Sequence, residues 1–157
     1  INDLVGEYLN LAYHGFRAQD STFNMKMDTE LDSSIGKINI VPQDISRVLL
    51  NIFSNACYSV HEKKKEKKDS FNPVLTTRTK SEGDKIIITI RDNGKGIPQE
   101  VLDKVFNPFF TTKPAGKGTG LGLSLSYEIV VKAHGGELKV NSEVGEYAEF
   151  IIILPKN

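Results

Sequence analysis

The chain has 157 residues, of which 39% are hydrophobic and 25% are charged, the composition of a folded globular domain large enough to bury one sizeable core. The charges of its 20 basic and 20 acidic side chains cancel, which argues against a nucleic-acid-binding protein. Its single cysteine excludes an internal disulfide framework and a zinc site with four cysteine ligands, and it fits a reducing compartment. No apolar run approaches the roughly 20 residues of a membrane span, so we expect this chain to make no membrane contact. Because the sequence begins at Ile1 rather than Met, we expect it to be a cytoplasmic fragment of a longer protein, with or without a membrane anchor in the parent.

The first third of the chain shows two helical patterns with extended segments between them. Apolar residues recur every three to four positions in residues 1–19, which predicts an amphipathic helix. Residues 22–31 alternate as a half-buried strand does, and residues 37–41 predict a short second strand. A second helix should begin at Pro42, because proline favours the first turn, and it should end in the charged residues 62–69, a solvated loop or helix end.

The remainder of the chain predicts more strands around a long irregular segment. The elements expected are strands 73–79 and 85–91, a helix over 121–134 and a hairpin of strands 137–141 and 147–154. Because strand 85–91 contains a continuous run of isoleucine and threonine, we expect it near the centre of a sheet. Residues 92–120 are rich in Gly, Pro and Thr, and a loop of that length typically closes over a ligand.

Asn51 and Asn55 are the first candidate site residues. They lie one turn apart on the helix that begins at Pro42 and flank its apolar stripe. An amide beside a buried face is costly unless it binds something, and an amide oxygen suits a magnesium ion that shares phosphate oxygens with a nucleotide. Taken alone, however, the pair is better explained by hydrogen bonds to the backbone or to water.

Asp92 ends the isoleucine-rich strand and is followed by Gly94 and Gly96. A carboxylate at a strand end accepts hydrogen bonds, and the two glycines would let a flat ligand approach the backbone. The two glycines stand where a calcium loop needs oxygen-bearing side chains, which excludes that loop. A plain turn is the alternative.

A glycine-rich segment, residues 116–123, opens the predicted helix over 121–134. Free amide groups at a helix start favour an anion, although neither the P-loop pattern nor the dinucleotide-binding pattern fits. Lys113 and Lys117 supply cations there, which favours a phosphate-covering loop over a flexible hinge. Phe106, Phe109 and Phe110 precede this segment. We expect them to fix a moving loop to the domain or to a partner, with ordinary packing on the core as the alternative.

In this order and at these spacings, the four groups resemble the N, G1, F and G2 boxes of sensor histidine kinases, which share an ATP-binding superfamily with Hsp90, gyrase and MutL proteins. The resemblance covers residues 42–154. It implies an α+β fold, a two-layer α/β sandwich with a mixed, mostly antiparallel sheet, helices on one face and a long ATP lid. Residues 1–19 would be the tail of a preceding dimerisation helix or a linker, and residues 20–157 the catalytic domain.

The resemblance also implies roles for single residues. Asn55 would coordinate Mg²⁺, Asn51 would support the phosphates as a catalytic residue, and Asp92 would bond to the adenine amino group. Lys113 would be the second catalytic residue. The other residues expected to contact ATP are Gly94, Gly96, Phe106, Phe110, Lys117, Gly118, Thr119, Gly120, Leu121 and Gly122.

The implied activity is transfer of the γ-phosphoryl group of ATP to a histidine on a dimerisation domain absent from this chain. The fragment alone should not autophosphorylate, since His14, His61 and His134 lack an acceptor motif. Expected partners are ATP, the phosphoacceptor helices of a homodimeric parent and a response regulator receiver domain. ATP-hydrolysing relatives have Glu where Asn51 stands, so efficient hydrolysis is not expected.

A family motif near the end of the chain departs from the usual pattern. Tyr147 and Ala148 stand where many members have Gly and Thr, and Tyr58 stands where many have Lys or Arg. A non-catalytic nucleotide-binding or scaffolding module of the same fold is therefore the alternative function.

Overall fold

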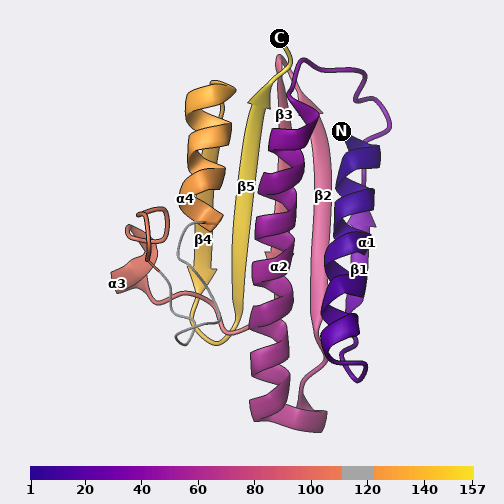
Figure 1. Cartoon of the computed structure of the whole chain (residues 1–157), viewed down its shortest axis with the longest axis vertical. Helices are drawn as coiled ribbons and strands as arrows, with labels where there is room; N and C mark the ends of the chain where they lie inside the picture. Colours follow the sequence, from indigo (N-terminus) through magenta and orange to yellow (C-terminus); the bar gives the residue numbers. More distant parts are fainter. Residues whose placement is uncertain (111–121) are drawn as a thin grey trace.

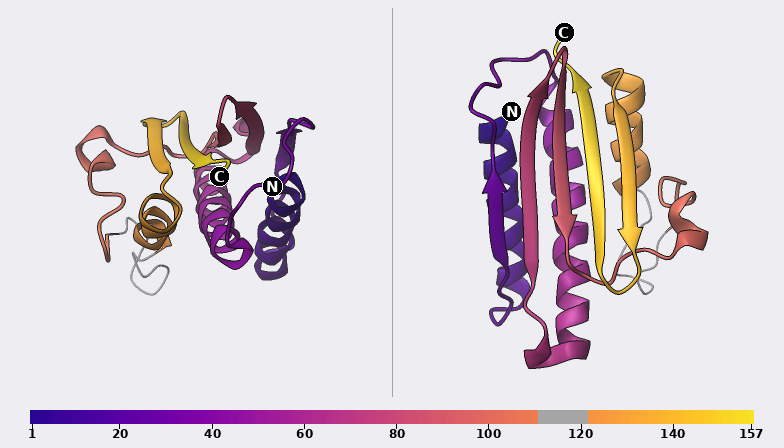
Figure 2. Two further views of the ribbon diagram at one scale, coloured as in Figure 1. Left: turned by 90° about the horizontal axis from the view of Figure 1, so that it is seen from above. Right: turned by 180° about the vertical axis from the view of Figure 1, so that it is seen from behind.

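The computed structural model describes residues 1–110 and 122–157, which fold around a five-stranded sheet with the order β1-β2-β3-β5-β4. The strands are β1 Lys26–Glu30, β2 Val74–Glu82, β3 Lys85–Asp92, β4 Glu137–Glu143 and β5 Tyr147–Pro155. β1 and β2 are parallel, and the other neighbours are antiparallel. Helices cover one face of the sheet, and the view from behind shows the opposite face uncovered (Figure 1, Figure 2). The predicted α+β class, with a mixed sheet and helices on one face, is confirmed.

Most of the helical segments lie on the covered face of the sheet (Figure 1). The helices are α1 Asn2–Gln19, α2 Pro42–Lys67, α3 Gln99–Leu102 and α4 Gly122–Tyr127, with a 3₁₀ turn η1 Lys68–Ser70 after α2 and a π-helical turn η2 Glu128–Ala133 after α4. Pro42 occupies the first turn of α2, with Asp44 near the positive end of the helix dipole. Among the described residues, no helix has both the length and the apolar character to span a membrane.

The long helix α2 lies across the middle of the sheet and supplies much of the core. Its buried apolar residues include Ile45, Val48, Leu49, Ile52, Phe53, Ala56 and Val60. They face the inward side of β3, where Ile86, Ile88 and Ile90 alternate with more exposed residues. Burial of such a side chain stabilises the fold by roughly 1.5–3 kcal/mol. β3 is the middle strand of the five, as its isoleucine run predicts.

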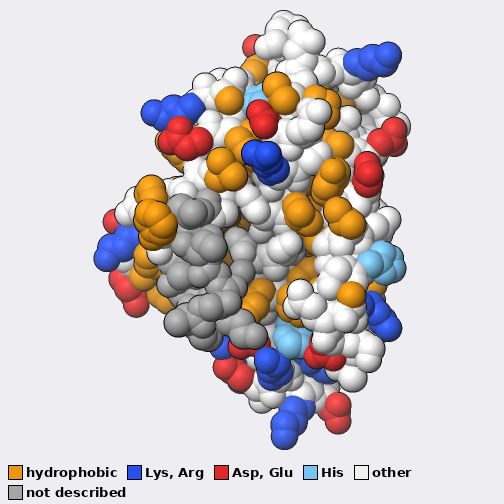
Figure 3. Space-filling model, in the orientation of Figure 1, with side chains coloured by type: hydrophobic (Ala, Val, Ile, Leu, Met, Phe, Trp, Pro, Cys, Tyr) orange, Lys and Arg blue, Asp and Glu red, His pale blue; other side chains and the backbone are white. Residues whose placement is uncertain are grey.

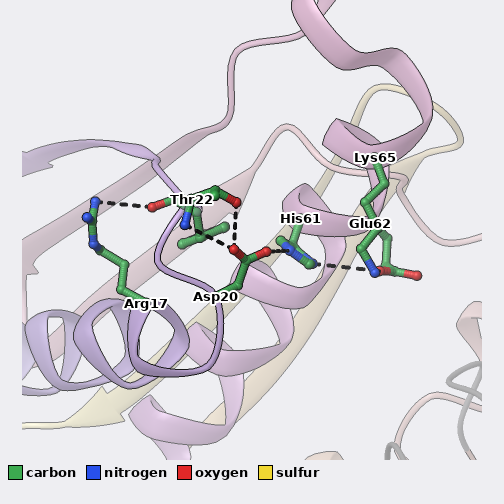
Figure 4. A network of polar contacts seen from close by, with 7 residues as sticks. Arg17, Asp20, Thr22, His61, Glu62 and Lys65 are labelled. Atoms are coloured by element: carbon green, nitrogen blue, oxygen red, sulfur yellow. Dashed lines mark hydrogen bonds and ion pairs between the residues drawn. The ribbon is translucent and has the colours of Figure 1, made fainter.

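α1 packs against α2 and shares its core through Val5, Leu9 and Ala12. Polar contacts fix the chain just after α1, where the Oδ2 atom of Asp20 lies 2.8 Å from Nε2 of His61 on α2 (Figure 4). The hydroxyl and the amide of Thr22 also donate to the Asp20 carboxylate. Mainly through the Thr22 hydroxyl and His61, these hydrogen bonds lower the pKa of Asp20 to about 2, so that it is charged at neutral pH.

The end of α2 is charged and largely exposed. Residues 62–67 continue the helix to Lys67, and the chain then turns at Lys68, whose φ is 51°. Lys and Arg side chains gather with acidic ones at this lower end of the molecule (Figure 3). Lys65 pairs with Glu62 at 2.9 Å and is 62% exposed. Most of this segment is therefore a solvated helix end, as predicted. Lys63 is an exception, because its ammonium group binds carbonyl oxygens of other segments.

Two local predictions were wrong. Residues 37–41 form no strand, because they connect the sheet-edge strand β1 to the start of α2, and Ile38 and Ile40 pack against the core without backbone pairing. The segment after β3 was expected to be irregular, yet it contains α3, which begins directly after Pro98. Alternating apolar residues therefore occur both in paired strands and in connecting segments that pack against the core.

Candidate functional site

Four polar side chains at intervals of four residues form a row along α2, namely Asn51, Asn55, Ser59 and Lys63. All four are half-buried beside the apolar stripe that packs on the sheet. The motifs predict Asn51 and Asn55 as site residues, but they do not predict Ser59 and Lys63. Their equal spacing was the available signal, since residues four apart lie on the same side of a helix.

Asn51 joins α2 to the first turn of α4. Its Nδ2 atom donates hydrogen bonds to the carbonyl oxygen of Gly122 at 3.1 Å and to the Ser126 hydroxyl at 3.4 Å. The Ser126 hydroxyl, which is fully buried, in turn donates to the same Gly122 carbonyl at 2.8 Å. The structure thus brings Asn51 next to Gly122 at the end of the glycine-rich segment, as the ATP-site hypothesis requires.

Asp92 lies at the end of β3 with only 4% of its surface exposed. Its Oδ1 atom accepts a hydrogen bond of 2.8 Å from the amide of Gly94. Burial raises the pKa of Asp92 to about 7, against the opposing effects of the Gly94 amide, the Lys63 charge and the Ser59 hydroxyl. A buried carboxyl group that titrates near neutral pH and has unused acceptor capacity is typical of a ligand-binding position.

The two glycines after Asp92 are required by close contacts. A Cβ atom on Gly94 would overlap the Ser59 side chain and lie 2.8 Å from its carbonyl carbon. Gly96 has a φ of 71°, and a Cβ atom there would overlap the backbone carbonyl of Glu143. The loop therefore packs backbone against α2 on one side and against β4 on the other.

Replacing Gly96 by alanine is expected to destabilise the fold by about 1–3 kcal/mol. Alanine would be strained at this positive φ, and its Cβ atom would clash with the carbonyl group of Glu143. Gly83→Ala is the matched control, since Gly83 has a φ of 61° but no atom within 4 Å of a Cβ. Thermal unfolding should show the larger loss for Gly96→Ala. Equal losses in the two variants would contradict the close approach to Glu143.

The phenylalanines before residue 111 differ in their environment. Phe106 is half-buried, and its ring centre lies 5.5 Å from that of Tyr127 and 6.5 Å from that of Phe150. Phe110 is also half-buried, whereas Phe109 is 73% exposed and has a φ of 66°. Phe106 thus shows the ordinary packing on the core that was the alternative, and Phe109 does not.

Several predicted residues lie outside the described residues. They are Lys113, Lys117, Gly118, Thr119, Gly120 and Leu121, together with most of the expected ATP lid. The departure at Tyr147 and Ala148 is described. Ala148 is the sheet partner of Asp92 and is buried, and the Tyr147 ring lies 3.9 Å from the Arg91 guanidinium carbon. The altered motif is therefore next to Asp92.

A magnesium ion would need more than protein ligands at this site. Among residues 1–110 and 122–157, no three His, Cys, Asp or Glu side chains lie close enough to hold a metal ion. Mg²⁺ keeps water and shares phosphate oxygens with its nucleotide, so one amide oxygen can complete its ligands. Asn55, half-buried between Asn51 and Ser59 in the row on α2, fits that requirement.

Comparisons with known proteins identify the family of the chain. The family model of histidine kinase-, DNA gyrase B- and HSP90-like ATPases matches residues 40–157. The chain is 33% identical over 156 residues to the sensor histidine kinase ZraS of Salmonella typhi and 40% identical over 129 residues to the signal transduction histidine-protein kinase AtoS of Escherichia coli. These matches cover 99% and 82% of the chain but only 30% and 19% of the two relatives, so the chain spans less than a third of their length.

Solved structures give the same result for the fold. The catalytic domain of the histidine kinase ThkA superposes with a TM-score of 0.75 at 27% identity, covering 96% of this chain and 93% of that one. The mycobacterial sensor histidine kinase MprB superposes with a TM-score of 0.71 at 23% identity and supports the fold alone. The resemblance that the motifs indicate is therefore confirmed, and the chain belongs to the family of histidine kinase-, DNA gyrase B- and HSP90-like ATPases.

Proposed function

We propose that this chain is the cytoplasmic, ATP-binding catalytic domain of a sensor histidine kinase. The domain would bind Mg-ATP and transfer its γ-phosphoryl group to a histidine. The observation that supports this most is that three segments distant in the sequence meet, namely α2, the start of α4 and the loop after Asp92. Asn51 bonds to Gly122 at the start of α4, and Ser59 and Lys63 contact the loop that follows Asp92. A nucleotide lying along α2 would reach all three segments.

The base would bind at the end of the site near β3. Asp92 would accept a hydrogen bond from the adenine amino group, and the backbone of Gly94 and Gly96 would line the pocket for the ring. The absence of side chains at these two glycines lets their loop pack closely against Ser59 and Glu143. At the other end, Asn55 would hold Mg²⁺, which when bound would neutralise charge on the phosphates. Asn51 fixes the start of α4. The glycine-rich segment before α4, which the sequence predicts to bind the phosphates through backbone amides, lies outside the described residues.

The acceptor histidine lies on another domain in this proposal. His61 is bonded to Asp20 at 2.8 Å, and Nδ1 of His134 lies 2.9 Å from the carbonyl oxygen of Ile129, so neither ring is presented to the site. His14 lies exposed on α1. The nucleophile would come from the phosphoacceptor helices of a homodimeric parent, and a response regulator receiver domain would then take the phosphoryl group.

Phosphoryl transfer can be measured by mixing this chain with the separate phosphoacceptor helices of its parent kinase and γ-labelled ATP. We expect label on the acceptor histidine, no label on this chain, and slow ATP hydrolysis by the chain alone, because Asn51 offers no carboxylate base. A version of the acceptor helices without the histidine is the control. Label on this chain itself would overturn the assignment of roles.

A non-catalytic nucleotide-binding module is the second candidate. The observation that favours it is the position of Ala148, the sheet partner of Asp92, where the family motif has a hydroxyl-bearing residue. Such a module would bind Mg-ATP without transferring phosphate to any acceptor. The mixing experiment separates the two functions, provided that ATP binding is measured on the same sample.

A further inference from the structure

Lys63 on α2 binds the backbone of two loops that are far apart in the sequence. Its ammonium group donates hydrogen bonds to the carbonyl oxygens of Asn93 at 3.0 Å, Gly94 at 3.3 Å and Gly145 at 2.7 Å. A lysine ammonium has three donors, so all of them are used. The ring centre of Phe71 lies 4.5 Å from the same nitrogen. Lys63 is thus held in one place on the otherwise solvated end of α2.

Two further residues of α2 bind the same loop through Lys95. The Ser59 hydroxyl oxygen accepts a hydrogen bond of 2.9 Å from the Lys95 amide, and a Glu66 carboxylate oxygen lies 2.7 Å from the Lys95 ammonium. Ser59, Lys63 and Glu66 lie four and then three residues apart, which places them on one side of the helix. We refer to these three residues as the loop clamp.

The loop clamp acts on the turn that surrounds Asp92. The carbonyl oxygen of Gly94 is bonded to Lys63, and the amide of the same residue is bonded to the Asp92 carboxylate. The titratable groups that interact with Asp92 among the described residues are Lys63 and Cys57, both on α2. The positive charge of Lys63 favours the ionised carboxylate, which can accept a hydrogen bond on each oxygen.

We propose that Lys63 is a positioning residue for the nucleotide base, because it holds residues 93–94 and 145 together in the shape that leaves Asp92 facing the ligand. Its effect on nucleotide binding rests on the proposed function, whereas the loop clamp itself needs no nucleotide. The last three turns of α2, beyond Asn55, serve in this view to extend the helix as far as the base-binding loop.

Lys63→Met tests the proposal, with Lys65→Met as the matched control. Both variants remove one positive charge from the same part of α2, but Lys65 pairs with Glu62 and does not touch the loop. Without nucleotide, we expect Lys63→Met to speed amide hydrogen exchange in residues 93–96 and 145 by at least about tenfold and to move the titration midpoint of Asp92, followed by NMR, to higher pH. Lys65→Met should leave both unchanged.

Lys63→Gln is the second variant if Lys63→Met does not fold. It keeps hydrogen-bond donors but not the charge, so the Asp92 midpoint should rise while part of the exchange protection remains. Adenosine nucleotides should bind about tenfold more weakly to Lys63→Met than to the wild type. Unchanged exchange and titration in Lys63→Met, or equal changes in Lys65→Met, would overturn the positioning role. Wild-type protein that binds no ATP would instead contradict the proposed function and leave the loop clamp intact.

Discussion

Asn55→Ala is expected to abolish the dependence of ATP binding on magnesium. In the wild type, the amide oxygen would hold the ion that also contacts the phosphates, so magnesium should tighten ATP binding. In the variant, ATP affinity in the presence of magnesium should fall by at least about tenfold, the loss that removal of even an outer-shell metal partner can cause. Isothermal titration calorimetry with and without magnesium measures both affinities.

Asn141→Ala is the matched control for Asn55→Ala. Asn141 is exposed on β4, and its side-chain amide donates a long hydrogen bond of 3.4 Å to the Glu149 carboxylate. Thermal unfolding of both variants should confirm that they are folded at the temperature of the titrations. A loss of affinity in Asn55→Ala that is the same with and without magnesium would contradict the role of Asn55 as a metal ligand.

Asp92→Asn is expected to weaken ATP binding by roughly 10- to 100-fold at pH 8, the range for loss of a hydrogen bond to a charged group. The asparagine oxygen can still accept the hydrogen bond from the Gly94 amide, but the NH₂ part of its side-chain amide cannot accept a hydrogen bond from the adenine amino group. In the wild type, affinity should rise between pH 6 and pH 8 as Asp92 ionises around its pKa of about 7. In the variant, this rise should be absent.

The same substitution should change how stability depends on pH. The pKa of Asp92 is raised in the folded chain, from 3.8 to about 7, so between these values the folded chain keeps a proton that the unfolded chain has released. The free energy of unfolding of the wild type should therefore fall with rising pH across this window, by up to about 1.4 kcal/mol per pH unit, and become constant above it.

Asp92→Asn has no proton to lose at this position, so its stability should lack that slope and exceed the wild-type stability above pH 7. Chemical denaturation at pH 5 and pH 8 measures the difference. A variant that binds ATP poorly and yet is more stable at pH 8 would show that the buried carboxyl group serves binding at a cost in stability. A slope equal to that of the wild type would show that Asp92 is not the group that titrates.

Much of the fold and of the site follows from local patterns in the sequence. The isoleucine run predicts the central strand β3, Pro42 predicts the start of α2, and the spacing of Asn51 and Asn55 places both amides on one side of that helix. These predictions succeed because helix and strand periods and the backbone limits of proline are properties of neighbouring residues. The motifs, in their order, were also sufficient to indicate the family.

The tertiary structure decided what the isolated patterns leave open. Residues 37–41 alternate like a strand, yet no strand is paired with them, because the chain must cross there from the sheet edge to α2. The charged end of α2 predicts only a solvated surface, yet Lys63 binds carbonyl oxygens up to 82 residues away. The pKa of Asp92 is likewise raised by burial in the folded chain, which its neighbours in the sequence do not reveal.

The sequence by itself therefore determined most of the helices and strands and the family of this protein. The folded chain alone decided which polar groups meet, since hydrogen bonds between α2, the loop after β3 and the β4–β5 turn depend on long-range packing that no local period encodes.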